Sequence, residues 1–409
     1  MKQSLCLIII VTTLLAGCNQ NAHPPAEEQP SKTNTEQNMQ KEEPDPVKRQ
    51  LENMTLEEKV TQLLYVGVQG TSLSDQERSM IQAGAGGVFL LGGNVESEAQ
   101  LTRYMNNIKE TDAQTDIPLF LGVDEEGGRV SRIPDTIENL PAAAAVGRSA
   151  DEETARQAGQ LLAEKVKRFG FNMDFAPVFD INSNPDNPVI GDRSYGTTAE
   201  QVSRIGTAVM KGIKEENVIP VVKHFPGHGD TSTDSHVQLP VVDKTRQEVE
   251  NMELLPFQQA VEEGADMVMT GHLLFPAVDE QYPASLSKAV ITGMLREQLH
   301  FDGVVVTDDM TMGAITNEYG MTEAAVQSLK AGADMVLIAE AGNGRFEELQ
   351  NALLQAVKDG DVTKDSINKS VTRILQLKQE SGLESKSPDV MEKAELNAEI
   401  RKWKQQLSQ

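Results

Sequence analysis

The chain has 409 residues, with 62 acidic side chains against 37 basic ones and a formal net charge of −25. An acidic protein without basic clusters is not expected to bind nucleic acid or to dock electrostatically on anionic lipid. Aromatic residues make up only 4% of the chain, and the single tryptophan, Trp403, lies near the C-terminus. A ligand platform built from several tryptophans is therefore excluded.

The first 17 residues have the pattern of a secretory signal peptide. Lys2 precedes an apolar run of about a dozen residues, which is too short for a membrane-spanning helix. The stretch Leu15-Ala16-Gly17-Cys18 resembles the lipobox of bacterial lipoproteins, which implies cleavage before Cys18 and lipidation of that residue. We expect a lipid anchor that holds the protein at the extracytoplasmic face of the cell membrane. The alternative is an uncleaved membrane anchor.

Residues 18–47, after the signal peptide, are predicted to form a flexible tether that begins with the lipidated cysteine. The segment is rich in Asn, Gln, Glu, Pro, Ser and Thr, so it buries too little apolar surface to offset its ordering entropy. A coil of this length reaches roughly 30 Å. Cys6 leaves with the signal peptide, so the folded part has no cysteine for a disulfide or a thiolate metal site.

From residue 48 to residue 383, short apolar runs alternate with helical patterns, which predicts βα units and a parallel sheet. Eight such units are the number that a single (β/α)8 barrel of the TIM type needs. An open, doubly wound sheet is the alternative. The expected strands are 63–68, 86–91, 118–123, 172–179, 218–222, 266–270, 303–307 and 334–339.

Local signals mark where the helices between these strands begin and end. Thr55 with Glu58 and Ser74 with Glu77 have the spacing of capping boxes at helix starts. Four glycines stand where helices should end, just before a strand: Gly84, Gly170, Gly264 and Gly332. Residues 384–409 form a C-terminal extension with one more predicted helix, whose apolar side should pack against the outside of the barrel.

The barrel predicts that functional side chains follow the C-terminal ends of the strands. Charged residues do gather at these positions, which predicts an active site on one face. They are Asp124, Glu125 and Glu126 after the third strand, Asp180 to Arg193 after the fourth, Lys223 to His236 after the fifth, His272 after the sixth, Asp308 and Asp309 after the seventh, and Glu340 after the eighth.

The segment from Lys223 to His236 contains three of the six histidines of the chain. Pro226 and the glycines around it exclude a regular helix, so these groups are expected on a loop, and the polar stretch 227–235 predicts that the loop is mobile. His224 and His228 have the spacing of helical zinc ligands, but the missing helix argues against that pairing. Zinc binding stays an alternative to acid–base chemistry.

Asp234 and His236 are two residues apart, so their side chains point the same way in an extended segment. A carboxylate bound to an imidazole fixes its tautomer and raises its basicity, which suits general acid–base catalysis. A simpler interpretation is a turn-capping aspartate beside an exposed histidine.

Two further carboxylate positions could act on a ligand. Asp308 and Asp309 follow a strand, so only one of them should face the barrel axis, where it could act as a nucleophile; the other could cap a helix. Asp124 precedes Gly127 and Gly128, which let the backbone approach a ligand while the carboxylate accepts hydroxyl protons.

Four segments together resemble the signature segments of family 3 glycoside hydrolases, especially the β-N-acetylhexosaminidase branch. They are KHFPGHGDTSTDSH (223–236), VDEEGGRV (123–130), GDRSYG (191–196) and VVTDDMTMGAI (305–315). The resemblance covers roughly residues 50–383. It implies a retaining exo-β-N-acetylglucosaminidase that removes terminal non-reducing N-acetylglucosamine from peptidoglycan fragments (muropeptides) or chitooligosaccharides, with no metal or organic cofactor.

The resemblance also implies a role for particular residues. Asp308 would attack the anomeric carbon, and His236, paired with Asp234, would be the acid/base. Glu125 stands where this branch often has Gln, which leaves its contact undefined. The implied sugar-binding residues are Asp124, Arg193, Lys223 and His224, with Arg129 as a weaker candidate.

Other functions stay open at this point. A β-glucosidase or an N-acetylglucosamine phosphorylase of the same family would share the fold and the nucleophile. A tethered sugar-binding lipoprotein is the alternative from another class. We expect a monomer.

Overall fold

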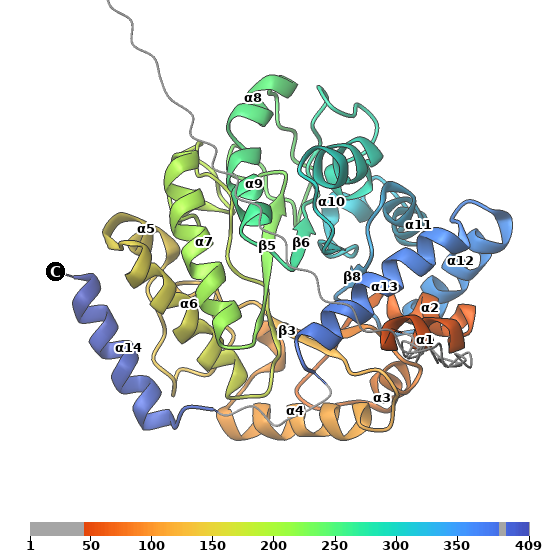
Figure 1. Cartoon of the computed structure of the whole chain (residues 1–409), viewed down its shortest axis with the longest axis horizontal. Helices are drawn as coiled ribbons and strands as arrows, with labels where there is room; N and C mark the ends of the chain where they lie inside the picture. Colours follow the sequence, from red (N-terminus) through yellow and green to blue (C-terminus); the bar gives the residue numbers. More distant parts are fainter. Residues whose placement is uncertain (1–44, 384–389, 409) are drawn as a thin grey trace, which may run out of the picture. The chain divides into compact units, whose positions relative to one another are not determined.

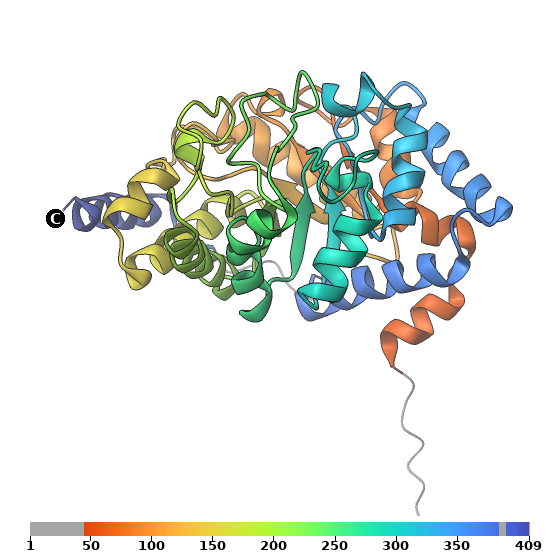
Figure 2. The same cartoon turned by 90° about the horizontal axis from the view of Figure 1, so that it is seen from above.

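The computed structural model describes residues 45–383 and 390–408 (Figures 1 and 2). These residues contain eight parallel strands. Their order is β7-β6-β5-β4-β3-β2-β1-β8, and one parallel bridge from Val306 to Met335 joins β7 to β8. The predicted (β/α)8 barrel is confirmed, and the open sheet is wrong. The strands are β1 (Leu64–Gly67), β2 (Gly87–Leu90), β3 (Phe120–Val123), β4 (Met173–Asp174), β5 (Ile219–Phe225), β6 (Met267–Thr270), β7 (Val304–Thr307) and β8 (Val336–Ile338).

Helices surround the strands (Figure 2). The α-helices are α1 (Pro46–Asn53), α2 (Leu56–Gln62), α3 (Asp75–Gln82), α4 (Glu98–Asp112), α5 (Ala143–Ser149), α6 (Glu152–Lys167), α7 (Ala199–Glu215), α8 (Arg246–Asn251), α9 (Leu254–Glu262), α10 (Gly313–Thr316), α11 (Met321–Ala331), α12 (Arg345–Asp359), α13 (Lys364–Glu380) and α14 (Lys393–Leu407). The shorter or wider turns are η1 (Gly92–Asn94), η2 (Gly191–Arg193), η3 (Ala284–Leu286) and η4 (Ala289–Gln298), the last a π-helix.

The local start and stop signals act as predicted. Both capping boxes form, with Thr55 capping α2 through Glu58 and Ser74 capping α3 through Glu77. The four helix-ending glycines have φ between +81° and +111°, the left-handed region that side chains disfavour. These features depend on residues three or four positions apart, so the sequence alone carries them.

The largest difference from the predicted strands lies at β4 and β5. Regular pairing in β4 stops at Asp174, whereas β5 runs on to Phe225 and includes Lys223 and His224, which were expected on the loop. The chain after β4 still follows β5, because the Phe179 amide donates to the Lys223 carbonyl at 2.6 Å. Lys223 and His224 therefore belong to a strand end that is held on both sides.

Aromatic side chains fill the barrel beneath the carboxyl ends of β1 to β4. Tyr65, Phe89 and Phe175 meet edge to face, with ring centroids 4.8 to 6.4 Å apart. A Cβ on Gly122 would lie 2.3 Å from the Tyr65 hydroxyl and 2.6 Å from the Phe175 ring. Glycine on β3 thus makes room for this cluster, which forms the floor under Asp124.

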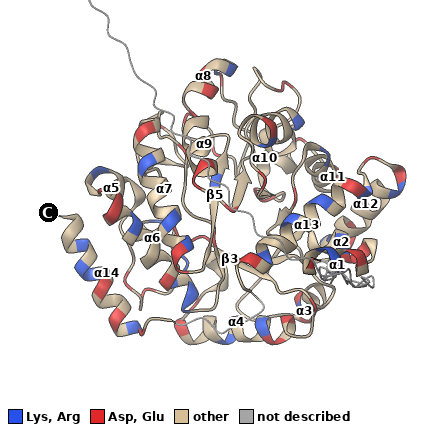
Figure 3. Ribbon diagram, viewed as in Figure 1, with Lys and Arg blue, Asp and Glu red and all other residues tan. Residues whose placement is uncertain are grey.

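Helix α14 packs on the barrel as predicted, with Leu396, Ile400 and Trp403 buried. It also holds the chain between β3 and α5, because the Asn397 side chain accepts from the Glu138 amide at 2.7 Å and donates to a neighbouring carbonyl. Acidic and basic residues are interspersed along this helix (Figure 3).

Several predictions concern residues outside those described. The signal peptide, Cys18, the tether up to residue 44 and residues 384–389 of the C-terminal extension lie there. The predicted tether ended at residue 47, but α1 already begins at Pro46, because Asp45 caps the helix and Val47 is buried. Within the described ranges, no helix is long and apolar enough to cross a membrane.

Candidate active site

A cavity of about 510 Å³ opens at the carboxyl ends of the strands. All eight predicted catalytic and sugar-binding residues line it, from the loops after β3, β4 and β7 and from the end of β5 and the loop after it. They are Asp124, Arg129, Arg193, Lys223, His224, Asp234, His236 and Asp308. Glu340 does not line it; its carboxylate pairs with Arg345 on the outside.

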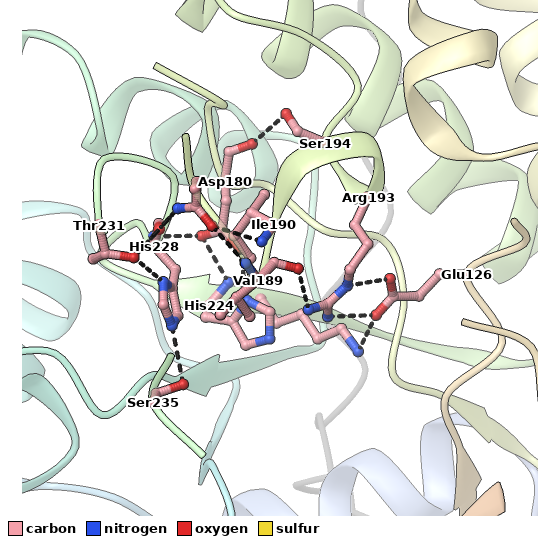
Figure 4. A network of polar contacts seen from close by, with 12 residues as sticks. Glu126, Asp180, Val189, Ile190, Arg193, Ser194, His224, His228, Thr231 and Ser235 are labelled. Atoms are coloured by element: carbon pink, nitrogen blue, oxygen red, sulfur yellow. Dashed lines mark hydrogen bonds and ion pairs between the residues drawn. The ribbon is translucent and has the colours of Figure 1, made fainter. Parts of the chain in front are cut away.

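A cluster of buried charges forms one wall of the cavity. The Lys223 ammonium lies 2.6 Å from Asp124 and 2.7 Å from Glu126. Arg193 binds both oxygens of Glu126 at 2.8 Å (Figure 4). Burial alone would lower the pKa of Lys223, but Asp124 and Glu126 raise it above its ordinary value. Burial raises the pKa of Glu126, and Arg193 and Lys223 more than offset this, leaving it well below its usual range. Lys223, Glu126 and Arg193 are therefore charged at neutral pH.

Asp180 orients the His224 ring through a hydrogen bond. Its Oδ2 lies 2.6 Å from His224 Nδ1, while its Oδ1 accepts the amides of His224 and His228 at 3.2 and 2.7 Å. Burial raises the pKa of Asp180, and His224 lowers it to a net value below the ordinary one. The ionised carboxylate therefore accepts from Nδ1–H, and His224 Nε2 has no hydrogen-bond partner among the described residues.

Asp308 and Asp309 both line the cavity, but their carboxylates differ in what they bind. Asp309 accepts from the Thr311 amide and hydroxyl and from the Ala339 amide, so it shapes the turn after β7. Among the described residues, Asp308 accepts only from the Asp309 amide, at 2.8 Å. Burial raises the pKa of Asp308, while His272 and His224 bring it below its ordinary value. Asp308 is the available anionic oxygen of the pair.

His272 supports this turn rather than facing the cavity. The buried ring lies 2.7 Å from the Ser285 hydroxyl and 2.9 Å from the Asp309 carbonyl. Since a carbonyl only accepts, Nε2 carries the proton and Nδ1 accepts from the Ser285 hydroxyl. His272 thus fixes the backbone between the two aspartates.

Asp234 and His236 form the expected pair at the cavity mouth. Asp234 Oδ1 lies 2.7 Å from His236 Nδ1 and 2.9 Å from its amide, and the two side chains are 42% and 65% exposed. Burial raises the pKa of Asp234, but the hydrogen bonds from His236 leave it below its ordinary value. Asp234 therefore accepts from Nδ1–H and leaves Nε2 to exchange protons. The predicted mobility of the loop stays a prediction.

The two arginines after β3 take different roles. Arg129 is turned toward the segment after β4, where its Nε lies 2.8 Å from Asp192 and its Nη2 2.5 Å from the Val189 carbonyl. Arg132, which the sequence reasoning missed, also lines the cavity, and its buried Nε has no hydrogen-bond partner among the described residues. Arg132 is therefore the arginine whose hydrogen-bonding capacity is unused.

Glu125 points away from the cavity and is fully buried. It forms an ion pair with Lys165 of α6 and accepts from the Ser131 hydroxyl at 2.9 Å and the Arg132 amide at 2.9 Å. The unexpected charge at this position is thus neutralised inside the protein. It shapes the loop that carries Asp124 and Arg132.

The described residues contain no group of three or more His, Cys, Asp or Glu side chains placed to hold a metal ion. His224 and His228 lie edge to face, with ring centroids 5.9 Å apart. The first is bound to Asp180, and the second to two hydroxyl groups.

The chain is similar in sequence to known glycosidases. Residues 55–377 match the family model described as the glycosyl hydrolase family 3 N-terminal domain. The chain is 33% identical to β-hexosaminidase A of Pseudoalteromonas piscicida over 72% of its own length, but spans only about half (53%) of that relative. It is 34% identical to β-hexosaminidase LpqI of Mycobacterium tuberculosis, covering 78% of this chain and 82% of the relative.

A solved structure shows the same similarity. The family 3 β-N-acetylglucosaminidase from Paenibacillus sp. str. FPU-7 superimposes with a TM-score of 0.80 and 40% sequence identity. The match covers 86% of this chain and 69% of that one.

Proposed function

The chain belongs to glycosyl hydrolase family 3, and on that premise we propose that it is a retaining exo-β-N-acetylglucosaminidase. One observation carries the proposal: the cavity holds an available carboxylate, Asp308, together with the His236–Asp234 dyad. A retaining glycosidase normally uses two carboxylates, one as nucleophile and one as acid/base. Here the dyad takes the place of the second.

In the first step, Asp308 attacks the anomeric carbon of the terminal sugar and the glycosidic bond breaks. His236 donates its Nε2 proton to the departing oxygen, so the leaving group departs as a neutral alcohol. In the second step, His236 takes a proton from water, which attacks the same carbon and releases Asp308. The ionised Asp234 holds Nδ1–H and stabilises the imidazolium whenever it forms.

The charged wall would bind the terminal sugar. Asp124 can accept hydroxyl protons, and the Lys223 ammonium and the His224 ring can donate to or accept from neighbouring hydroxyls. Arg132 offers its Nε–H, which has no hydrogen-bond partner among the described residues. Arg193 binds Glu126 and so helps to position the charged wall. Arg129 is the weaker candidate for binding the sugar, because its guanidinium is already bound to Asp192.

The proposed setting follows from the N-terminal sequence. We propose that residues 1–17 are a signal peptide, that Cys18 carries the lipid, and that residues 48–383 form the catalytic domain of a monomer tethered outside the cytoplasm. Muropeptides or chitooligosaccharides are then the substrates within reach. Globomycin-sensitive processing and mass spectrometry of Cys18 test the anchor separately from the activity.

A direct assay tests the activity. The purified protein is incubated with chromogenic β-N-acetylglucosaminide and β-glucoside, with and without phosphate. We expect turnover of the acetamido substrate. NMR spectra recorded during the reaction should show the β-anomer of the released sugar before the α-anomer appears. Preferred turnover of the glucoside indicates a β-glucosidase, phosphate-dependent formation of a sugar phosphate indicates a phosphorylase, and binding without turnover indicates a tethered sugar-binding protein.

A trapping experiment tests the nucleophile. A fluorinated glycosyl donor that forms a long-lived intermediate should add its sugar mass to the peptide containing Asp308. Asp309→Asn is the matched control, because that carboxylate is occupied by the turn. Labelling at Asp309, or full activity of Asp308→Ala, would overturn the assignment.

A further inference from the structure

His228 is a buried histidine that the reaction described above does not use. Its ring contacts two hydroxyl groups of the loop that carries the dyad, which we call the dyad loop (residues 230–238). Nδ1 lies 2.8 Å from the Thr231 Oγ1 and Nε2 lies 3.0 Å from the Ser235 Oγ (Figure 4). Ser235 is the residue between Asp234 and His236, and it is buried while its two neighbours are exposed.

The hydrogen bonds define the tautomer of His228. The Thr231 hydroxyl donates to the His228 carbonyl at 3.1 Å, so its oxygen accepts the proton of Nδ1. The Nε2 lone pair is then left to accept from the Ser235 hydroxyl. Burial, together with the charge on His224, lowers the pKa of His228 to about 4, which keeps the ring neutral at pH 7. Both ring nitrogens are therefore engaged by the protein.

A second set of contacts holds the same loop from the side of the nucleophile. The carbonyls of Ser235 and His236 accept the amides of Ala314 and Gly313, each at 3.1 Å. The Asn317 side chain donates to the next carbonyl, that of Val237, at 2.9 Å. Since α10 follows β7 directly, these bonds connect the dyad to the segment that carries the nucleophile. They act on the main chain, whereas His228 acts on the side chain of Ser235.

We propose that His228 is a positioning residue for the acid/base dyad, acting through the Ser235 hydroxyl. The inference rests on the proposed function, because it assigns His228 to the proton-transfer half of that site. With its side chain held inward, Ser235 turns the side chains of Asp234 and His236 outward into the cavity. Without the hydrogen bond from Ser235 to His228, only the main-chain bonds to α10 would hold this part of the loop, and the Ser235 side chain would be free to rotate.

Loss of the Ser235–His228 contact should affect the two kinds of substrate differently, whereas a general weakening of the fold should slow both equally. An acid is needed most when the leaving group is a poor one, so a misplaced acid slows unactivated substrates and spares activated ones. We therefore compare kcat/KM for a dinitrophenyl N-acetylglucosaminide with kcat/KM for an unactivated disaccharide. The readout is the ratio of kcat/KM for the disaccharide to kcat/KM for the dinitrophenyl substrate, which falls when the acid is misplaced.

Ser235→Ala removes only the hydroxyl that His228 holds. We expect a loss of about 10- to 100-fold on the disaccharide and less than about 3-fold on the dinitrophenyl substrate. Ser183→Ala is the matched control, because Ser183 donates to Asp230 of the same loop at 3.0 Å and has no contact with the dyad. This control should leave the ratio unchanged.

Two variants of His228 test the imidazole itself. His228→Asn keeps a donor near the Nδ1 position and loses the contact to Ser235, whereas His228→Gln places an amide oxygen near the Nε2 position. The ratio should fall in His228→Asn and recover in part in His228→Gln. The double variant Ser235→Ala/His228→Asn should cost no more than the worse single one, because both remove one interaction.

Each outcome has a defined meaning. An equal loss on both substrates in Ser235→Ala, or no loss on either, would overturn the positioning role. If the buried His228 variants fail to fold, Ser235→Ala against Ser183→Ala decides the question alone. If the unmodified protein turns over neither acetamido substrate, the proposed function fails instead, so the two failures are distinguishable.

Discussion

The segment from Lys223 to His236 begins in a buried ion cluster and ends in an exposed dyad. The Lys223 side chain is 3% exposed and is paired with two carboxylates, while His236 is 65% exposed and is paired with one. Phe225, the last residue of β5, separates a part fixed by the barrel from a part held by hydrogen bonds to neighbouring loops.

The difference reflects what each end has to do. Buried charges are stable only when they are paired, and a paired cluster gives a fixed set of donors and acceptors for a ligand. A proton carrier instead must exchange protons with a leaving group and then with water, so it needs access. One short segment thus combines a rigid binding wall with an accessible acid/base.

The largest effect should come from the buried end. Lys223→Met leaves Asp124 without its cation and removes one cation from Glu126, so we expect loss of detectable activity and a fall of about 3–5 kcal/mol in the free energy of unfolding. Urea unfolding measures the second effect. Lys211→Met is the matched control, since its ion pair with Glu263 is exposed and should contribute at most about 1 kcal/mol. Equal destabilisation by both variants would contradict the distinction.

The exposed end should lose activity without losing stability. His236→Ala should lower kcat/KM on an unactivated disaccharide by about 10²- to 10⁴-fold, because it removes the proton donor. Its free energy of unfolding should stay within about 0.5 kcal/mol of the unmodified protein, as for other surface positions. A destabilisation as large as that of Lys223→Met would mean that the exposed dyad also supports the fold.

A smaller effect should follow from moving the dyad loop. A Cβ on Gly313 would lie 2.6 Å from the Val237 carbonyl oxygen and 2.7 Å from that of His236, so Gly313→Ala has to displace the loop. We expect a loss of about 10- to 100-fold in kcat/KM. Gly293→Ala, where the nearest atom would lie 3.9 Å away, is the control. Unchanged activity in Gly313→Ala would show that the dyad tolerates displacement.

The smallest effect, taken per pH unit, is a pH dependence of stability due to His228, which lies between the two ends. Its folded pKa of about 4 is below the ordinary value of 6.5. The unfolded chain then binds more protons between pH 6.5 and pH 4, so stability falls with decreasing pH in that window, by at most about 1.4 kcal/mol per pH unit. Asp180 and Asp308, which act on this ring, have lowered pKa values and titrate below the window. His228→Asn should show a smaller slope; an identical slope would contradict the prediction.

Much of the fold could be predicted because its determinants are local. Strands, capping boxes and helix-ending glycines are each defined by residues a few positions apart, and each of the eight strands overlaps its predicted range. The extent of β5 could not be predicted, because the contacts that extend it come from the chain after β4 on one side and from the end of β6 on the other. A short apolar run does not reveal which distant segment pairs with it.

The site divides in the same way. Residue type and position after a strand identified Asp124, Lys223 and Asp308, and spacing identified the Asp234–His236 pair. The same rule about strand ends had marked Glu126 and Asp180, but it did not assign them partners, since those partners lie 67 and 44 residues away. Arg129 and Arg132 lie on one loop, and only the packing of that loop decides which of them has free donors.

The buried pair of Glu125 and Lys165 has a consequence for building chimaeric enzymes. The glutamate lies on the loop after β3 and the lysine on α6, so a segment exchange that stops at the end of the loop separates them. A donor loop with glutamine at this position would leave the ammonium group of Lys165 buried beside a neutral side chain. Asn139, its other partner, is uncharged as well. Loop and helix therefore have to be exchanged as one cassette.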